Sequence, residues 1–439
     1  MRVSLGELRL RLHRRGFIKN VLILAAGTGI GQVLVVLASP VLTRLYSPED
    51  FGILAVYVST LSFLVVVASF RYHLAIPLPD DDVTAANILV LSTFIVFIFS
   101  IFTGLVVFFW GEQIVRWLNE PMLGGWLWLL PFSLFGAGVY QVFNFWAVRK
   151  KYFDRIAKTK LTQSLGQVLV QVIFGLCNFG PLGLLFGDVV GRVSGSSALI
   201  TLTWQKSKHC FTAVSIPEIC RAAYRYRRFP LLSSGSALLN NAGLQLPPLL
   251  LAVLYGTQVA GWFALGQRVI SIPMLLVGQA VAQVYYSEAS RLSLEDPKAL
   301  KTLFLKTARG LLTWGLVPIG LLAVGGPWFF VFVFGEAWRD AGGYVQLLSL
   351  MFLIQFVVVP LSQTLNVLER QDWQLIWDTM RFILVVGGIV VAYALKWPAW
   401  TAVMIYGLLM LFSYLGLFIL SNIAILKVLE KIKDERVKE

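Results

Sequence analysis

Long apolar runs are the feature of this sequence that most restricts its fold. One of them, from about Ala260 to Tyr286, is long enough as a helix to cross a bilayer at about 1.5 Å per residue. A membrane-spanning segment must satisfy its backbone polar groups internally, which leaves only helices and closed barrels. Of the 439 residues, 57% are hydrophobic and only 14% are charged. We therefore expect an all-α polytopic membrane protein, and a soluble enzyme is excluded.

Twelve such runs are predicted as transmembrane helices. They extend from about Phe17 to Leu45, Phe51 to Ile76, Val83 to Trp110, Gly124 to Val148, Leu161 to Phe179, Leu182 to Trp204, Pro230 to Leu254, Val259 to Ser287, Thr307 to Phe334, Tyr344 to Leu368, Leu375 to Leu395, and Trp400 to Leu426. With the N-terminus inside, this threading leaves 28 Lys and Arg residues on the cytoplasmic side, four outside and five within spans. The bias follows the positive-inside rule and predicts that both termini are cytoplasmic.

The basic loop of residues 205–229 divides the spans six and six. We expect an N-terminal lobe of residues 1–204 with helices 1 to 6, a basic cytoplasmic linker of residues 205–229, and a C-terminal lobe of residues 230–439 with helices 7 to 12 and a basic tail. A short echo at a spacing of 209 residues supports this division, because LTRLYSPEDFG at Leu42 falls on LAVLYGTQVAG at Leu251. Six-plus-six repeats are a transporter architecture with the substrate site between the halves.

Arginines inside the spans point to the chemistry of the site. Arg268 lies within the eighth span, where a charge normally faces a wet cavity or a partner, and at 100° per residue Gln279 and Gln283 fall on the same side. Pro273 is expected to bend this helix. A structural pair or a side chain snorkelling to the interface is the alternative explanation for Arg268.

Two further arginines are spaced to pair with carboxylates, Arg192 with Asp188 at i,i+4 and Arg381 with Asp378 at i,i+3. Neutral polar stripes recur at Gln163, Gln167 and Gln171 and elsewhere, and they indicate either hydrogen bonds between helices or a water-filled cavity. Five arginines against two carboxylates within the spans favour an anion, above all phosphate, as ligand.

Catalytic and metal chemistry finds no support in the sequence. No Walker motif, nucleophile elbow or HExxH is present. The three cysteines and three histidines form no metal or disulfide pattern. The acidic run of residues 80–82 precedes the third span, where carboxylates cap a helix N-terminus. Gly27 and Gly31 form a GxxxG motif, which predicts close helix packing.

Four segments resemble the Wzx-type polysaccharide flippases of the multidrug/oligosaccharidyl-lipid/polysaccharide exporter superfamily. They are SPVLTRLYSPEDFG from Ser39, SFRYHLAIPLPDDD from Ser69, GQRVISIPMLLVGQAVAQVYYSEAS from Gly266, and FGEAWRDAGGYVQLLS from Phe334 with PLSQTLNVLERQ from Pro360. The resemblance spans nearly the whole chain. It implies two six-helix lobes around a central cavity, and transport of undecaprenyl-diphosphate-linked oligosaccharide to the periplasmic leaflet of the bacterial inner membrane.

The resemblance also implies a cationic cavity. The predicted binding residues for diphosphate and glycan are Arg268, Arg71, Arg44, Arg192, Gln279, Gln32, Asn241, Gln363 and Asn366. Asp188 and Asp378 are candidates for coupling to H⁺ or Na⁺, and no cofactor or metal is expected. A polysaccharide polymerase and a chain-length regulator are possible partners, and nucleic acid is not.

Three other functions are weighed against this one. A MATE-like small-molecule antiporter of the same superfamily would favour a more acidic cavity for cationic drugs. A membrane glycan polymerase or ligase would need catalytic carboxylates outside, and Glu112, Glu120, Glu336 and Asp340 form no recognisable site. A scaffold for other assembly proteins is the third alternative.

Overall fold

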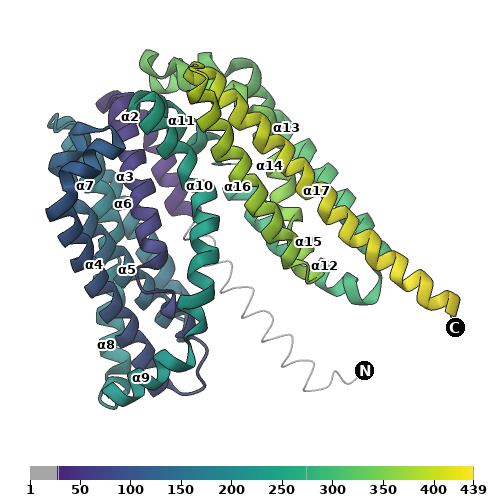
Figure 1. The fold of residues 1–439 in the computed structure, drawn as a ribbon, viewed down its shortest axis with the longest axis horizontal. Coiled ribbons are helices and arrows are strands. Elements are labelled where there is room, and N and C mark those ends of the chain that lie inside the picture. The colour runs from purple at the N-terminus through teal and green to yellow at the C-terminus, as the bar shows by residue number, and fades with distance from the viewer. Residues whose placement is uncertain (1–26, 28, 273, 439) are drawn as a thin grey trace. The chain divides into compact units, whose positions relative to one another are not determined.

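A computed structural model describes residues 27, 29–272 and 274–438 of the chain (Figure 1). Over these residues every regular element is a helix, which confirms the predicted all-α class. In this described part of the chain seven helices are long and apolar enough to cross a membrane, so the chain is a multi-pass membrane protein. They are Pro48–Val67, Asp82–Leu118, Ala237–Tyr255, Pro297–Phe334, Glu336–Val367, Gln371–Ala394 and Ala399–Glu430. The total of twelve spans that the sequence suggests stays a prediction.

The chain forms two compact units. Met1–Tyr46 and Tyr57–Asn241 form the first, and Ser47–Val56 and Ala242–Glu439 form the second. Helices α3 (Pro48–Val67) and α10 (Ser234–Tyr255) each contribute to both. These two units are defined by contacts within the chain, whereas the predicted lobes are defined by the linker of residues 205–229. The division into lobes stays a prediction.

The first unit is built from helices joined by short turns. In chain order it contains α2 (Ser39–Leu45), the part of α3 that begins at Tyr57, η1 (Tyr72–Ala75), α4 (Asp82–Leu118), η2 (Pro121–Trp126), α5 (Leu129–Arg149), α6 (Phe153–Leu176), α7 (Pro181–Val193), α8 (Ser196–Phe211), α9 (Ile216–Arg225) and η3 (Phe229–Ser233). Local sequence sets several of their starts. Asp81 caps α4, as predicted for the acidic run, since its Oδ1 accepts a hydrogen bond from the Thr84 amide at 2.7 Å.

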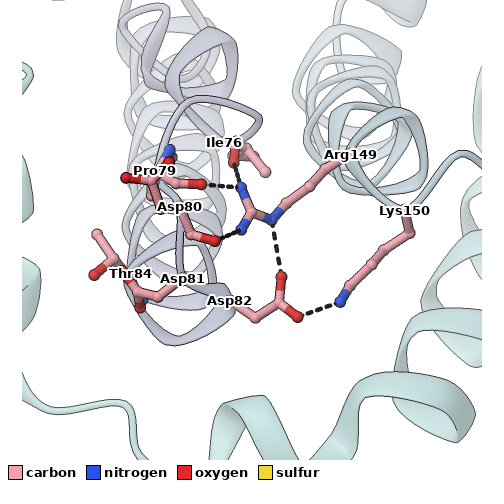
Figure 2. Close-up of polar contacts among 8 residues, drawn as sticks. All are labelled: Ile76, Pro79, Asp80, Asp81, Asp82, Thr84, Arg149 and Lys150. Carbon is pink, nitrogen blue, oxygen red and sulfur yellow. Dashed lines mark hydrogen bonds and ion pairs between the residues drawn. The ribbon is translucent and has the colours of Figure 1, made fainter. Parts of the chain in front are cut away.

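A clamp of charged groups fixes the turn before α4 to the end of α5 (Figure 2). The Arg149 guanidinium donates to the Asp82 carboxylate at 3.0 Å and to the backbone carbonyls of Ile76, Pro79 and Asp80, and the Lys150 ammonium pairs with the same carboxylate. Hydrogen bonds to a charged group are about twice as strong as neutral ones. The acidic run is therefore a structural joint as well as a helix cap.

Helices α6 and α7 interlock through glutamines and glycines. A Cβ added to Gly187 would lie 2.3 Å from Gln171 Cγ, and one added to Gly191 would lie 2.9 Å from Gln167 Cβ. Gln171 is 1% exposed and donates to the Leu184 carbonyl at 3.1 Å. Of the two explanations for this glutamine stripe, the structure supports hydrogen bonding and packing between helices at Gln171, because glycines on α7 leave room for the side chains.

The GxxxG motif near the N-terminus packs as predicted. A Cβ on Gly27 would lie 2.4 Å from Ala157 Cβ, and one on Gly31 would lie 2.7 Å from Ser164 Oγ, both on α6. The remainder of the predicted first span, residues 17–26 and 28, lies outside the described residues.

The second unit contains the longest helices. It begins with the part of α10 from Ala242 onward. The elements that follow are α11 (Thr257–Ile270), η4 (Met274–Gly278), α12 (Gln279–Glu295), α13 (Pro297–Phe334), η5 (Glu336–Trp338), α14 (Arg339–Leu361), α15 (Gln363–Val367), α16 (Gln371–Ala394) and α17 (Ala399–Lys438). Its core is rich in aromatic side chains, with Phe263, Tyr344, Tyr406 and Tyr414 all buried. The outward face of α13 is apolar and exposed, for example at Phe332, which suits contact with lipid.

The sequence echo marks a symmetric contact within the second unit. Helices α3 and α11 begin at Pro48 and Thr257, which are 209 residues apart. A Cβ on Gly52 would lie 1.8 Å from the Thr257 carbonyl oxygen, and a Cβ on Gly261 would lie 1.8 Å from the Pro48 carbonyl oxygen. Each glycine therefore admits the backbone of the other helix, and equivalent residues of the echo contact one another.

Several predicted spans are not continuous helices, and two of them are broken near the middle. The sixth, residues 182–204, is broken by a turn at residues 194–195 between α7 and α8. The eighth, residues 259–287, is divided into α11, a turn of π-helix and α12, and Pro273 itself lies outside the described residues. A π-turn changes the angular register, so a spacing of 100° per residue does not hold across this break, and a shared side for Arg268, Gln279 and Gln283 stays a prediction.

Candidate functional site

A cluster of charged groups lies inside the first unit where α5, α6 and α7 meet. The Arg192 guanidinium holds the Asp188 carboxylate through two bonds, Nε to Oδ2 at 2.6 Å and Nη2 to Oδ1 at 3.2 Å. The ion pair predicted from the i,i+4 spacing is thereby confirmed. The Asp188 side chain is 9% exposed and the Arg192 side chain 28% exposed, so the pair is accessible mainly from the arginine.

Lys160 on α6 adds a second cation to this cluster. Its ammonium lies 4.6 Å from the centre of the Tyr140 ring, and it feels electrostatic repulsion from Arg192. Within the described chain no carboxylate pairs with Lys160. The cluster thus holds two cations, Arg192 and Lys160, and one carboxylate, Asp188, which pairs with Arg192, so it keeps an excess of positive charge. Such an excess within apolar helices is energetically unfavourable unless an anion or water compensates it.

Arg71 occupies a strained position between α3 and α4. Its backbone has φ of 65°, in the left-handed region that non-glycine residues rarely adopt, and its Nε donates to Ser233 Oγ at 3.4 Å. Burial lowers the pKa of the Arg71 guanidinium. Strain of this kind persists only where surrounding structure holds it, and it often marks functional sites.

His73 lies beside Arg71 and is buried against Phe145. Its Nδ1 bonds the Ser69 hydroxyl at 2.5 Å, and its Nε2 is buried with no hydrogen-bond partner among the described residues. Burial, with the neighbouring Arg71 charge, lowers the pKa of His73 to about 3. The imidazole is therefore neutral at physiological pH.

Arg268 lies near the end of α11 in the second unit. Its guanidinium carbon is 5.9 Å from the centre of the Phe51 ring, and Phe51 in turn packs edge-on against the buried Trp338 at 4.9 Å. The side chain is half-buried. Arg268 is thus placed beside the segment Ser47–Val56, where the two glycines of the symmetric contact meet.

The second predicted ion pair is also present. Arg381 Nη2 donates to Asp378 Oδ1 at 2.9 Å, and the guanidinium lies 4.6 Å from the centre of the Trp377 ring. The Arg381 side chain is 7% exposed, and its Nε is buried with no hydrogen-bond partner in the part of the chain that the structure describes. The Arg381 side chain is more enclosed than that of Arg192, although Asp378 at 21% is more exposed than Asp188 at 9%, and the enclosed guanidinium favours a structural role.

The remaining predicted residues are more dispersed. Arg44, Gln32 and Gln279 are exposed on α2, the helix before it and α12. Asn366 Nδ2 donates to Gln363 Oε1 at 3.0 Å, so these two form a local pair. Asn241 Nδ2 is buried, and no described residue offers it a hydrogen bond.

Lys160 is a functional candidate that the sequence does not single out, because the predicted threading places it in the cytoplasmic loop of residues 149–160. A signal was available: on a helix of 100° per residue Lys160, Gln163, Gln167 and Gln171 share one face. Among the described residues no group of three His, Cys, Asp or Glu side chains could hold a metal ion.

Comparison with known proteins identifies the family. The family described as "Polysaccharide biosynthesis protein" matches residues 41–343, more than half of the chain. The succinoglycan biosynthesis transport protein ExoT of Rhizobium meliloti (strain 1021) is 24% identical over 360 residues, covering 80% of this chain and 69% of that protein. The lipopolysaccharide biosynthesis protein WzxC of Escherichia coli (strain K12) is 25% identical over 166 residues, covering 37% and 33%.

Solved structures share the fold at low identity. A multidrug resistance MATE family transporter of the MOP superfamily, in an inward-facing conformation, has a TM-score of 0.74 at 15% identity, covering 91% of this chain and 96% of that one. A MOP superfamily transporter from Pyrococcus furiosus has a TM-score of 0.59 at 14% identity, covering 93% and 96%. The chain therefore belongs to the polysaccharide biosynthesis protein family, and it shares its fold with transporters of the MOP superfamily.

Proposed function

We propose that this protein is a flippase that moves undecaprenyl-diphosphate-linked oligosaccharide from the cytoplasmic to the periplasmic leaflet of the bacterial inner membrane. The product would serve O-antigen, capsule or exopolysaccharide biosynthesis. The single observation that carries the proposal is the excess of positive charge in the cluster of Lys160, Arg192 and Asp188, inside the helices of a member of the polysaccharide biosynthesis protein family. A diphosphate supplies the anionic charge that such a cluster lacks.

The proposed mechanism assigns the cations to the headgroup. Arg268, Arg71, Arg192 and Lys160 neutralise the diphosphate in the course of transport, Arg44 assists at the outer side, and the prenyl chain stays in lipid. Gln32, Asn241, Gln279, Gln363 and Asn366 offer hydrogen bonds to the glycan. Alternating access of the two lobes then carries the headgroup across. The protein acts as a transporter and performs no covalent chemistry.

Coupling to H⁺ or Na⁺ is proposed at Asp188. Its carboxylate is held by Arg192, which remains partly exposed and could release it when a diphosphate binds the guanidinium. The same exchange is less favourable at Asp378, because Arg381 is almost fully enclosed. A polymerase and a chain-length regulator are the proposed partners.

The test is transport of lipid-linked oligosaccharide in proteoliposomes. Arg268→Ala and Lys160→Met are each expected to reduce the flipping rate at least about tenfold, as loss of one charge-assisted contact of about 1.5 kcal/mol implies. Arg268→Lys is expected to retain part of the activity, since it keeps the charge but loses the fork of donors. Arg309→Ala, an exposed arginine on α13, is the matched control and is expected to be unchanged.

Each contrary result has a meaning. If both Arg268→Ala and Lys160→Met flipped the substrate at an unchanged rate and at equal abundance, the proposed role of these cations in transport would be contradicted. Absence of flipping by the unaltered protein, together with drug resistance conferred on cells, would favour a MATE-like antiporter.

A further inference from the structure

Helix α9 is held against one end of the first unit by contacts near both of its own ends. The Ser215 amide, directly before α9, donates to Asn87 Oδ1 on α4 at 3.2 Å. Near the other end of α9, the Ala223 carbonyl accepts a hydrogen bond from the Tyr72 hydroxyl of η1 at 3.0 Å. Both partners belong to the same end of the unit, because η1 directly precedes α4 and contacts it. The helix therefore lies across that end of the unit (Figure 1).

The contact with Asn87 places α9 between the polar and the apolar parts of the surface of α4. At the start of α4, Asp82 belongs to the charged clamp, which requires water or lipid headgroups around it. Farther along, Phe94 is 61% exposed and suits contact with lipid. At about 1.5 Å per residue, Asn87 lies about 7.5 Å from Asp82 and about 10.5 Å from Phe94 along the helix. The start of α9 is therefore near the boundary between water and lipid.

The surface of α9 has three sectors. Ala222 is 4% exposed and faces the unit. Ile216, Cys220 and Tyr224 follow each other at i,i+4, lie within about 80° of one another, and form the outward stripe. All three are exposed, Ile216 at 77% and Tyr224 at 69%. Arg225 is also exposed and points about 140° away from Cys220. The helix thus presents a buried sector, an apolar sector and a cationic sector.

The residues around the outward stripe fit a lipid surface. Arg227, just after the helix, places its guanidinium carbon 4.2 Å from the centre of the Tyr224 ring. Among the described residues, no carboxylate pairs with Arg225 or Arg227. Tyrosine is enriched at membrane interfaces, and unneutralised arginines beside a membrane are attracted to lipid phosphates. Because the chain spans a bilayer, lipid can cover the apolar stripe and offer phosphates to the arginines at the same time.

We infer that α9 lies in the plane of the membrane interface, with its outward stripe of Ile216, Cys220 and Tyr224 inserted into lipid. The arginines of the cationic sector face the headgroups and water. Amphipathic helices of this kind bury their apolar face about 5–10 Å into the boundary between headgroups and acyl chains. The inserted helix anchors the segment between α8 and α10 to the bilayer. This surface is independent of the proposed transport function, because none of its residues belongs to the proposed substrate site.

The native Cys220 allows a direct test, because it lies in the middle of the outward stripe. The full chain with Cys177→Ala and Cys210→Ala is labelled at Cys220 in detergent with a fluorophore and reconstituted into vesicles of phosphatidylethanolamine and phosphatidylglycerol. A phospholipid with a nitroxide near the top of its acyl chain is expected to reduce the emission at least about twofold, since the stripe is inserted to about 5–10 Å. Aqueous iodide is expected to have little effect.

The matched control moves the probe to the cationic sector of the same helix. Arg225→Cys, with the three native cysteines replaced by Ala, is expected to be quenched strongly by iodide and weakly by the lipid nitroxide. A second variant, Ile216→Ser combined with Tyr224→Ser, removes most of the apolar stripe while the probe stays at Cys220. Both side chains are exposed, so the fold is expected to be kept. In this variant iodide quenching is expected to rise and lipid quenching to fall.

Four results would overturn the proposal. Strong iodide quenching at Cys220 would place the outward stripe in water. Protection of Cys220 from both quenchers would show that protein covers the stripe, from a partner or from a second copy of the chain. Equal lipid quenching of the probes at Cys220 and in Arg225→Cys would contradict the orientation of the helix. Unchanged quenching in the Ile216→Ser and Tyr224→Ser variant would show that the stripe does not hold the helix in lipid.

Discussion

Individual charged residues in this protein separate into enclosed and accessible groups. Arg381 and His73 are buried with unsatisfied nitrogens, whereas Arg192 and Lys160 keep part of their surface accessible. A buried charge or imidazole that no water reaches contributes to the stability of the fold and its pH dependence. An accessible cation can exchange its partner for a ligand. The predictions at this scale test that distinction.

For His73, stability is expected to fall in acid. Its folded-state pKa of about 3 lies below the ordinary value of 6.5, so the unfolded chain takes up a proton first and folding loses free energy as pH falls through this window. One such group contributes at most about 1.4 kcal/mol per pH unit. Replacement of His73 by Gln is expected to flatten the decline in thermal unfolding temperature between pH 7 and pH 5. An unchanged pH profile would show that other groups govern it.

For the pair of Asp378 and Arg381, removing one member is expected to lower the stability of the fold more than removing both. Asp378→Asn leaves a buried guanidinium without its carboxylate, at about 3–5 kcal/mol, whereas Asp378→Asn combined with Arg381→Met removes the charge as well. Thermal unfolding in detergent of the two single variants and the double variant measures the coupling. Additive losses would contradict the enclosed pair.

At the scale of elements, close backbone contacts depend on glycine at particular crossings. Gly52 and Gly261 admit carbonyl groups of the opposite helix, and the glycines of α7 admit the glutamines of α6. Because a carbonyl of a helix cannot move without breaking its own hydrogen bond, such contacts tolerate no added methyl group. They determine which helices touch.

Gly52→Ala and Gly261→Ala are each expected to lower stability. The added methyl group would overlap a backbone carbonyl, with a loss of about 1–3 kcal/mol. Gly310→Ala on α13 is the matched control, because no atom lies within 4 Å of its added Cβ, and alanine favours the helix by about 1 kcal/mol. Thermal unfolding of the three variants provides the comparison. Equal effects at all three positions would contradict the close crossing of α3 and α11.

At the scale of the whole molecule, the distribution of basic residues predicts the orientation in the membrane. The loops assigned to the cytoplasm carry 28 Lys and Arg residues and those assigned to the outside carry four. Positive charge is retained on the cytoplasmic side during insertion, so the threading implies an outer position for the end of α6 and an inner position for α9. The native cysteines lie at suitable places to test it.

Cys177 at the end of α6 and Cys220 on α9 are exposed, whereas Cys210 is buried. In single-cysteine variants expressed in a bacterial inner membrane, a membrane-impermeant maleimide added to spheroplasts is expected to label Cys177 and not Cys220. Permeabilisation with detergent is expected to expose Cys220. Labelling of Cys220 from outside would reverse the orientation.

The sequence by itself determined the helical class, the membrane environment, the two ion pairs and the family. These follow from local composition and from i,i+3 and i,i+4 spacing, which any helix obeys. The echo at 209 residues also pointed to positions that meet in the folded chain.

Only the tertiary structure decided the breaks in two spans, the inclusion of Lys160 in the Arg192 cluster, and the Arg149 clamp. A π-turn shifts the register of every later side chain, and a lysine at a helix end can extend toward the core or away from it with the same local sequence. Arg149 and Asp82 are 67 residues apart, so no short-range pattern links them. Contacts of this kind depend on which helices pack together, which the periodicity of one segment does not specify.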